Sequence, residues 1–592
     1  MTQPKLIQFI SRGYERFREV QQVRMSRNFD GLPLLSILGL ICGLVSGGLI
    51  ILFRLAMEAS AGWFLPNGDI EGFENLSRSM RFLLCVAGGL LVGLILQACK
   101  AKSRTVGVVH VIERLDYHQG YLPIKNAIVQ FFTASISLLS GHSVGREGPS
   151  VHLGAAGGSL LGRLLEVPNN GVRILVGSGI AAAISAAFNT PLAGVIFAME
   201  VIIMEYTVIG FTPVIIAAVS ATTLTRILLG DDHAIIAPVY NLNFISEIPL
   251  VALMGAVIGC ISAAFIQLTL ITSSLFVNQA IWARTVMAGL ITGSIAMILP
   301  EVMGTGYDTV NHVLLAKIGL TGVILLTVAK LVTTATAIGL GIPAGLIGPT
   351  LFIGAVAGSA FGLLAADFSP GITGAGFYAM LGMAAMMAAT LQAPLAALIY
   401  LLELTNNQAV ILPGMTAVVM ASLVTRIVFK KSSIYRHLML ARGVDYRNSP
   451  MAKTLRRIGV ASVMQRDFVQ PEMQINKTEA EKILQQEPRW ILLNDLEKRK
   501  ANLLPAADLA RHLNDLDTED DNNQEQKLNL LTIPAKRLET VAIPIIATLQ
   551  EAHEKMQSND CEVLYVTGAH GNAKKRIYGI ITREHIDSSY QF

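Results

Sequence analysis

Charged residues and paired cysteines are the features that this sequence has least of. Of its 592 residues only 15% are charged, whereas 52% are hydrophobic. So large an apolar share excludes an ordinary soluble protein of this length and indicates a chain that crosses a membrane many times. The five cysteines form no Cys-x-x-Cys pair, which argues against a disulfide or metal framework.

Strand-like alternation is also missing from the apolar region, residues 31 to 430, so the sequence predicts a helical membrane protein. Its apolar runs approach the length of about 20 residues that a spanning helix needs. The clearest runs are 32–53, 82–98, 251–276, 286–299 and 320–340. The first 30 residues contain no apolar stretch of the signal-peptide kind, so we expect no cleaved leader.

Basic residues flank the apolar region on both sides. They occur throughout the polar arm 1–30 and again at Lys430, Lys431, Arg436 and Arg442. Positive flanks usually face the cytoplasm. We therefore expect an inner (plasma) membrane protein with both ends cytoplasmic and an even number of crossings. The net charge of +4 gives no reason to expect a nucleic-acid partner.

Two pairs of segments in the apolar region resemble each other. GREGPSVHLGAAGGSLLG (145–162) aligns with GLIGPTLFIGAVAGSAFG (345–362), and PLAGVIFAME (191–200) aligns with PLAALIYLLE (394–403). Close helix packing explains matching small residues, but it does not explain two Gly-Pro breaks and two PLA…E segments. We infer two halves, about 31–230 and 250–430, each with a broken helix, as expected of transport proteins.

From residue 443 the sequence becomes charged and changes its pattern. Strand-like runs lie at 489–495, 561–567 and 576–582. Two Thr-x-x-Glu sequences, Thr478 to Glu481 and Thr548 to Glu551, fit capping boxes of helices that precede strands. An acidic linker, 514–526, separates them. Residues 455–592 are therefore predicted to form a small cytoplasmic α+β domain of two similar units.

GREGP (145–149) places Arg146 and Glu147 between glycines in apolar surroundings. A Gly-Pro break ends one helix and starts another. Backbone N–H groups at a helix start, together with the helix dipole, make an anion site. An ionised Glu147 would compete with an anion for these donors and a protonated one would not, so this residue could be both gate and proton acceptor. The alternative is a structural Arg146–Glu147 pair.

These motifs resemble those of the CLC family of chloride channels and chloride/proton antiporters over residues 31–445, and the C-terminal region resembles a pair of CBS domains. The resemblance implies inverted repeats, a homodimer with one pathway per subunit, and bound chloride without a cofactor. It makes Glu147 the gating glutamate. It assigns the anion pathway to Val106, Gly107, Arg146, Glu147, Gly148, Leu346, Ile347, Gly348 and Tyr435.

Two positions depart from the family's pattern. Val106 stands in TVGVV (105–109) where a serine hydroxyl would bind the central anion, so we expect a weaker or differently selective site. Val201 follows Glu200 where antiporters commonly have a second, proton-transferring glutamate. Because valine cannot carry a proton, this position favours passive, channel-like conduction. Exchange through another route, by Glu205 or water, stays open.

GHSVG (141–145) also fits the G-x-S-x-G elbow of serine hydrolases. A hydrolase needs a strand before Ser143, but the preceding segment is apolar and helix-like. The apolar region has no HExxH or Walker sequence either, so we expect neither an enzyme nor a metal site. A secondary transporter of another anion remains an alternative, since helix starts and Arg146 argue against a cation.

CBS pairs often bind adenine nucleotides through an Asp three residues after a Thr or Ser. Here His585 follows Thr582 at that distance, and Asp508 is preceded by Pro505. We therefore expect a structural or dimer-stabilising role, with Asp508 and Thr582 as the candidate contacts if a nucleotide binds. Lys330 lies in an apolar run, where it either lines a vestibule or extends to the membrane interface.

Overall fold

The computed structural model describes residues 31–65, 68–231, 235, 238, 240, 247–369, 371–444, 450–495, 500–519, 527–568 and 577–590. The expected N-terminal arm and residues 520–526 of the expected acidic linker lie outside the described residues. The chain divides into two units, each described by itself. One comprises Leu34–Leu164 with Val172–Tyr446, and the other consists mainly of Arg447–Phe592.

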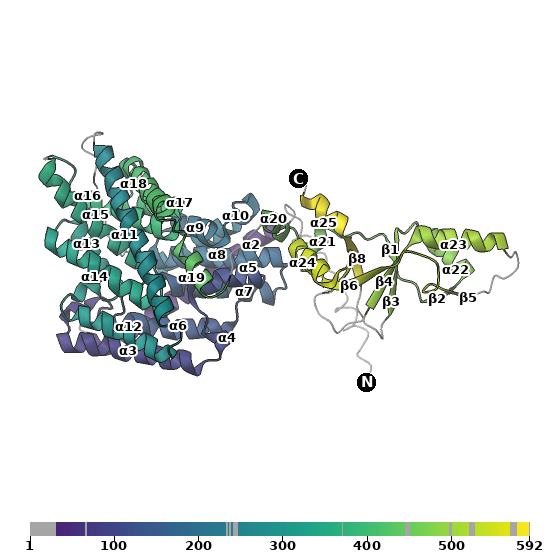
Figure 1. The fold of residues 1–592 in the computed structure, drawn as a ribbon, viewed down its shortest axis with the longest axis horizontal. Helices are drawn as coiled ribbons and strands as arrows, with labels where there is room; N and C mark the ends of the chain where they lie inside the picture. Colours follow the sequence, from purple (N-terminus) through teal and green to yellow (C-terminus); the bar gives the residue numbers. More distant parts are fainter. Residues whose placement is uncertain are drawn as a thin grey trace. The chain divides into compact units, whose positions relative to one another are not determined.

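The first unit is built from helices (Figure 1). The longer ones are α2 (Leu32–Phe64), α3 (Arg78–Ala98), α6 (Ile124–Leu139), α7 (Glu147–Leu164), α8 (Asn169–Phe188), α10 (Val208–Leu229), α11 (Ile248–Leu275), α12 (Ile281–Ala296), α14 (Leu320–Gly339), α15 (Ile347–Phe368), α16 (Ala375–Leu391) and α18 (Ile411–Leu423). The shorter ones are α4 (Ala101–Arg104), α5 (Gly107–Tyr117), α9 (Pro191–Phe197), α13 (Tyr307–Leu314), α17 (Pro394–Thr405) and α19 (Ile434–Ala441). Single turns are the 3-10 segments η2 (Gly72–Asn75), η5 (Pro300–Val302) and η6 (Gln408–Val410) and the π segments η3 (Ala198–Ile203) and η7 (Val424–Val428). Within the described ranges, eight helices are long and apolar enough to cross a membrane, which confirms a polytopic membrane protein.

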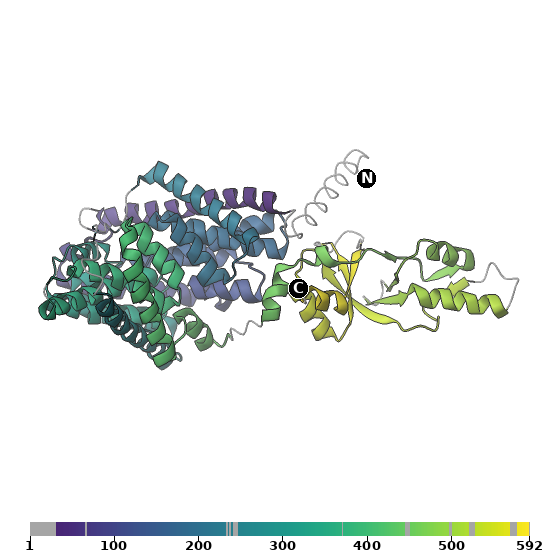
Figure 2. The ribbon, with the colours of Figure 1, turned by 90° about the horizontal axis from the view of Figure 1, so that it is seen from above.

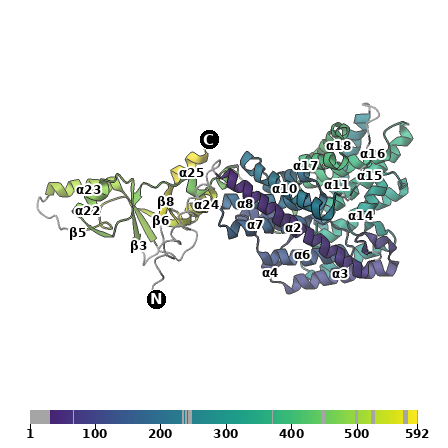
Figure 3. The same cartoon turned by 180° about the vertical axis from the view of Figure 1, so that it is seen from behind.

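Small residues let the helices of this unit approach closely. Helix α2 lies along α10, which Figure 3 shows from behind. A Cβ added to Gly39 of α2 would lie only 2.6 Å from the carbonyl oxygen of Pro213 in α10. Leu40 and Leu44, on the same helix, stay exposed. Backbone-to-backbone packing on one side and exposed leucines on another are the arrangement expected of helices in lipid.

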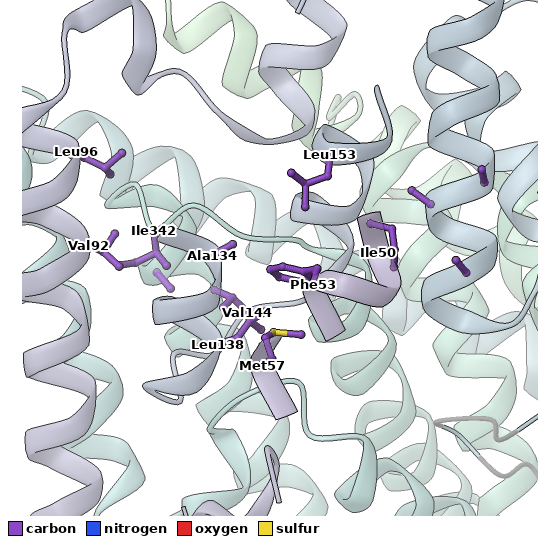
Figure 4. Packing of buried hydrophobic residues seen from close by; sticks show 14 of the residues in the cluster. Ile50, Phe53, Met57, Val92, Leu96, Ala134, Leu138, Val144, Leu153 and Ile342 are labelled. Carbon is purple, nitrogen blue, oxygen red and sulfur yellow. The ribbon is translucent and has the colours of Figure 1, made fainter. Parts of the chain in front are cut away.

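The two halves repeat one order of elements. Helices α6 to α10 of the first half correspond to α14 to α18 of the second, and the Gly-Pro pairs of the two breaks lie in the first turns of α7 and α15. One apolar cluster packs against both breaks (Figure 4). It includes Val144 before α7 and Ile342 before α15, together with Phe53 of α2. The fold therefore places the two breaks on a common core, as expected of a duplicated chain.

The second unit contains the strands (Figure 2). The strands are β1 (Phe468–Val469), β2 (Gln474–Asn476), β3 (Trp490–Asp495), β4 (Lys500–Pro505), β5 (Lys527–Asn529), β6 (Leu538–Pro544), β7 (Val563–Thr567) and β8 (Ile577–Thr582). The helices are α20 (Pro450–Arg457), α21 (Val460–Val463), α22 (Lys477–Leu484), α23 (Ala506–Glu519), α24 (Leu549–Asn559) and α25 (Arg583–Tyr590). The sheet runs β1-β3-β4-β6-β7-β8, and β2 pairs with β5.

This unit is itself a repeat. The order β1-α22-β3-β4-α23 recurs as β6-α24-β7-β8-α25, with β1 parallel to β3 and β6 parallel to β7. The three strand-like runs became β3, β7 and β8, which confirms the α+β prediction. The capping box of Thr548 and Glu551 is confirmed at α24.

The capping box predicted at Thr478 and Glu481 was wrong. The N-cap of α22 lies two residues before Thr478, at Asn476, so the helix begins at Lys477 and its box is formed by Asn476 and Glu479. Asparagine caps a helix at least as well as threonine. The sequence therefore held two acceptable boxes in overlapping positions, and the earlier one is used.

Candidate functional site

The two Gly-Pro breaks meet in the first unit. The Gly145 N–H donates to the carbonyl oxygen of Gly345 at 2.9 Å, and the Gly345 N–H donates to that of Gly145 at 2.7 Å. The contact is an antiparallel bridge. Helices α7 and α15 begin two residues beyond it, so two positive helix ends start at one crossing.

The Glu147 carboxylate lies at the start of α15. Its Oε1 accepts from the Gly348 N–H at 2.9 Å and from the Tyr307 hydroxyl at 3.0 Å. The side chain is only 1% exposed, and Oε2 has no hydrogen-bond partner among the described residues. From this position an ionised carboxylate takes a backbone donor that an anion at the helix start would need.

Glycines allow the close approach at the crossing. A Cβ on Gly145 would overlap Oε2 of Glu147, and one on Gly345 would lie 2.5 Å from the Gly148 nitrogen. At Gly345 the neighbours include the backbone nitrogens of Glu147 and Gly148, which cannot move aside, whereas at Gly145 they are the far end of the Glu147 side chain. Gly345 is therefore needed for the two loops to touch.

Arg146 does not pair with Glu147. Its guanidinium lies over the rings of Phe188 and Tyr307, 5.6 Å and 5.3 Å from their centroids. In the part of the chain that the structure describes, no ion pair joins Arg146 to Glu147, so the structural pair considered as an alternative is not formed. Arg146 instead supplies positive charge beside the crossing.

Tyr307 and Glu71 belong to the site, and sequence reasoning missed both. Tyr307 begins α13, and its N–H donates to Glu71 Oε2 at 2.8 Å, while the Thr305 hydroxyl donates to Glu71 Oε1. Glu71 lies in the loop between α2 and α3. Burial and the neighbouring Asp308 carboxylate raise the pKa of Glu71 above its usual value. No spacing pattern links residues 71, 147 and 307, so the sequence carried no signal for this contact.

Val106 and Gly107 form the start of another helix. Val106 is the N-cap of α5, and Gly107 has φ of +83°. Helix α5 packs against α7, whose first residue is Glu147, and against α19, which carries Tyr435. An apolar N-cap offers the helix start no side-chain hydrogen bond. The structure thus places Val106 at a helix start.

Val201 and Tyr435 line one cavity of about 250 Å³. Its wall also carries Ile112, Glu200 and the cationic side chains of Arg426 and Arg436. The two arginines make the cavity suitable for an anion. Val201 lies in a π-helical turn, a geometry that often occurs at functional sites.

The two PLA…E segments cap each other. Glu200 accepts from the N–H groups of Leu395 and Ala396 at 3.1 Å and 2.7 Å, at the start of α17. Glu403 accepts from those of Leu192 and Ala193 at 2.8 Å each, at the start of α9. Each glutamate thus ends one copy of the motif and satisfies the helix start of the other copy. Reciprocal contacts of this kind are expected of inverted halves.

Two further polar groups, Glu205 and Ser143, are accounted for by their partners. Glu205, the alternative proton carrier, forms an ion pair with Arg173 at 4.0 Å. Ser143 follows α6 instead of a strand, and its hydroxyl bonds to that of Thr334 at 2.9 Å, so the hydrolase elbow is not formed.

The expectation that Lys330 extends to the membrane interface was wrong. Its side chain is fully buried. Its Nζ donates to the carbonyl oxygens of Val302 and Gly304 at 3.0 Å and 2.9 Å and lies 4.6 Å from the Phe352 ring centroid. Two carbonyl dipoles and a ring face compensate a charge that burial alone would make costly.

A buried imidazole pair, His110 of α5 and His152 of α7, was also missed. His110 Nδ1 and His152 Nε2 are 3.0 Å apart, and both side chains are buried. In the described part of the chain, His152 Nδ1 has no partner. The two helices that carry the pair are those that begin at Gly107 and Glu147.

The candidate nucleotide contacts have protein partners. Asp508, in the first turn of α23, pairs with Arg511 at 3.6 Å. The Thr582 hydroxyl and N–H both bond to His585 Nδ1, at 2.9 Å and 3.2 Å. His585 therefore caps the start of α25 at the position where an aspartate would contact a ribose.

Comparison with known proteins decides the family. A model of the voltage gated chloride channel family matches residues 88–426. The chain belongs to this family. A ClcB-like protein from Ralstonia nicotianae is 33% identical over 401 residues, which cover 65% of this chain and 91% of that protein. The H(+)/Cl(-) exchange transporter ClcA of Vibrio cholerae is 34% identical over 295 residues, 48% of this chain and 63% of the relative.

Solved structures show the fold. A slow cyanobacterial Cl-/H+ antiporter matches with a TM-score of 0.60 at 23% identity and covers 70% of this chain and 99% of its own. A eukaryotic CLC transporter matches with a TM-score of 0.57 at 18% identity and covers 96% and 98%. The CLC resemblance is therefore confirmed. As a member of the voltage gated chloride channel family, the chain is a multi-pass membrane protein that transports anions.

Proposed function

We propose that the protein carries chloride across the membrane along a pathway gated by Glu147, and that conduction is passive. The observation that carries the proposal is the Glu147 carboxylate on the Gly348 N–H, 2.9 Å from the donor that an anion would use. Passive conduction is supported by Val201 and Ile112, two apolar residues in the cavity wall. Neither can accept a proton.

Chloride/proton exchange is the second candidate. The Vibrio cholerae relative and the cyanobacterial structure are both named for exchange. Within this chain the His110–His152 pair places titratable groups on α5 and α7, and Glu200 lines the cavity. A proton route past Val201 would have to use such groups or water, since Glu205 is paired with Arg173.

The deciding experiment records chloride and external pH together from proteoliposomes under a chloride gradient. Chloride efflux without proton movement supports passive conduction. Coupled uphill proton movement supports exchange by a route that bypasses Val201. Absence of chloride flux with flux of another anion would favour the remaining alternative, a secondary transporter of that anion.

The assembly and orientation are also proposals. We propose a homodimer in the inner membrane with one pathway per subunit and both ends of the chain in the cytoplasm, following the family resemblance and the basic flanks. Crosslinking of the purified protein tests the dimer. Labelling of single cysteines at the two chain ends with an impermeant reagent tests the orientation, and labelling from outside the cell would contradict it.

We expect Val106→Ser to raise chloride affinity. A serine N-cap adds a hydroxyl donor at the start of α5, and a hydrogen bond to a charged partner is worth about a tenfold change in binding. Isothermal calorimetry of chloride binding measures the change. Val108→Ser, one position inside α5, is the control that leaves affinity unchanged. Equal affinities for Val106→Ser and wild type would remove Val106 from the pathway.

We propose that the C-terminal unit is structural or stabilises the dimer, and does not bind adenine nucleotide. Thr582 already bonds to His585, and Asp508 already pairs with Arg511. Thermal melting of the full chain with added adenosine monophosphate tests this, since a ligand that binds only the folded state raises the melting temperature. A raised melting temperature would establish a nucleotide site.

The His585 cap should make this unit sensitive to acid. Burial, aided by Arg489, lowers the pKa of His585, and Glu584 opposes the shift. A histidine with a lowered folded pKa stabilises the fold above its unfolded value near pH 6.5, and the contribution is lost as pH falls through the folded value. Hydrogen exchange of residues 577–590 in the full chain should therefore accelerate in acid beyond its intrinsic pH dependence. His585→Asn should remove the excess, and an unchanged excess would contradict the assignment.

A further inference from the structure

Tyr307 joins three groups of the site that come from distant parts of the chain. Its hydroxyl donates to Glu147 Oε1 at 3.0 Å. Its N–H donates to Glu71 Oε2 at 2.8 Å. Its ring lies under the Arg146 guanidinium, 5.3 Å from the centroid. The side chain is buried, and Glu71 also holds the adjacent Thr305 hydroxyl. The tyrosine is therefore fixed by its backbone, its ring and its hydroxyl at once.

We propose that Tyr307 is a latch that holds the ionised Glu147 carboxylate on the start of α15, and that Glu71 positions the latch. A hydroxyl bonds more strongly to an ionised carboxylate than to a neutral carboxyl group. The bond therefore favours the ionised, blocking form of Glu147, and protonation weakens it. The inference rests on Glu147 as the gate, but it holds for passive conduction and for exchange alike.

None of the other charged and titratable groups around Glu147 in the described part of the chain replaces the hydrogen bond from the Tyr307 hydroxyl. Arg146 is the cation that acts on Glu147, and Tyr400 and Tyr435 are the other phenols within its field. On the far side of Tyr307, the charges of Asp308 and Lys330 act on Glu71. Among the described residues, Tyr307 is the one side chain that donates to the Glu147 carboxylate. Its loss leaves the Gly348 N–H as the remaining donor from another element.

Tyr307→Phe removes the hydroxyl and keeps the ring under Arg146. Without the latch, less acid should be needed to release Glu147. In proteoliposomes the curve of chloride flux against external pH should move to higher pH by about one unit, the tenfold effect expected of a hydrogen bond to a charged group. In a Glu147→Gln background the same change should have no effect on the curve.

Tyr378→Phe is the matched control. Tyr378 is also buried, and its hydroxyl also donates to a carboxylate, that of Glu247, at 3.1 Å. Its pH curve should superimpose on that of the wild type. An equal shift in this control would mean that the loss of any buried hydroxyl moves the curve, and would overturn the latch.

Glu71→Gln tests the positioning part and leaves the Tyr307 hydroxyl in place. It should move the curve in the same direction by a smaller amount, and it serves as the decisive variant if Tyr307→Phe does not fold. An unshifted curve in folded Tyr307→Phe, or in Glu71→Gln when that variant must decide, overturns the inference. Failure of the proposed gate can be distinguished from failure of the latch. If Glu147 is not the gate, Glu147→Gln alone will keep the pH dependence of the wild type.

Discussion

Replacing Glu147 with glutamine is expected to leave the anion pathway open at every pH. Glutamine has nearly the size of glutamate but carries no charge, so it cannot take the place of an anion at the start of α15. Chloride flux at neutral pH should rise to the level that the wild type reaches in acid. Any coupling to protons should disappear as well, because the amide has no titratable oxygen.

The measurement is flux from proteoliposomes over the pH range in which a carboxyl group titrates. Glu247→Gln is a suitable control, since Glu247 is also a buried carboxylate that accepts from a backbone N–H and a tyrosine hydroxyl. The control should keep the pH dependence of the wild type. If Glu147→Gln kept it too, the gate would have to be a different group, and the proposal that the Gly348 donor is blocked by Glu147 would be abandoned.

Much of this site could be foreseen because its signals are local in the sequence. A charged pair framed by glycines and followed by proline is unusual in an apolar chain, and it drew attention to Glu147. The repeat was visible because GREGP and GLIGP keep glycine and proline at the same spacing. The positions of proline and glycine indicate where helices start, so the starts of α7 and α15 could be predicted from the sequence.

What could not be foreseen depends on contacts between distant residues. Nothing in the sequence states that Tyr307 donates to Glu147, or that the His110 and His152 rings bond. The same limit applies to Lys330, because its compensation comes from carbonyl groups at Val302 and Gly304 that local hydropathy does not reveal. Contacts between side chains that are distant in the sequence depend on tertiary packing, and a single sequence does not reveal that packing.

The repeated glutamates show how duplication turns a local motif into a tertiary contact. PLA…E is read in each half as a proline that starts a helix and a glutamate near its end. In the folded chain Glu200 caps α17 and Glu403 caps α9. In each case the glutamate of one copy caps a helix of the other half, so the motif's structural role requires both copies. The Gly145–Gly345 bridge likewise joins matched segments of the two halves, beside Glu147.

The bridge should be the least tolerant point of the pathway. We expect Gly345→Ala to abolish most chloride flux and to destabilise the protein. The added methyl group would lie 2.5 Å from the Gly148 nitrogen and would overlap the Glu147 carboxylate. Because the Gly148 nitrogen belongs to the backbone and cannot move aside, the crossing must open. Overpacking of this kind costs about 1–3 kcal/mol, and displacing the two helix starts should reduce flux by about tenfold or more.

Flux and thermal melting of the purified variant measure the two effects. Gly374→Ala is the matched control, since Gly374 also lies next to a helix start, has φ of −60°, and a Cβ there meets nothing within 4 Å. It should transport and melt like the wild type. Normal flux in Gly345→Ala would show that the two breaks can separate without loss of the pathway, and the anion site would then have to lie away from the crossing. If Gly345→Ala loses flux and adding Glu147→Gln to the same chain does not restore it, the damage lies in the helix starts. It does not then lie in a Glu147 side chain that can no longer move.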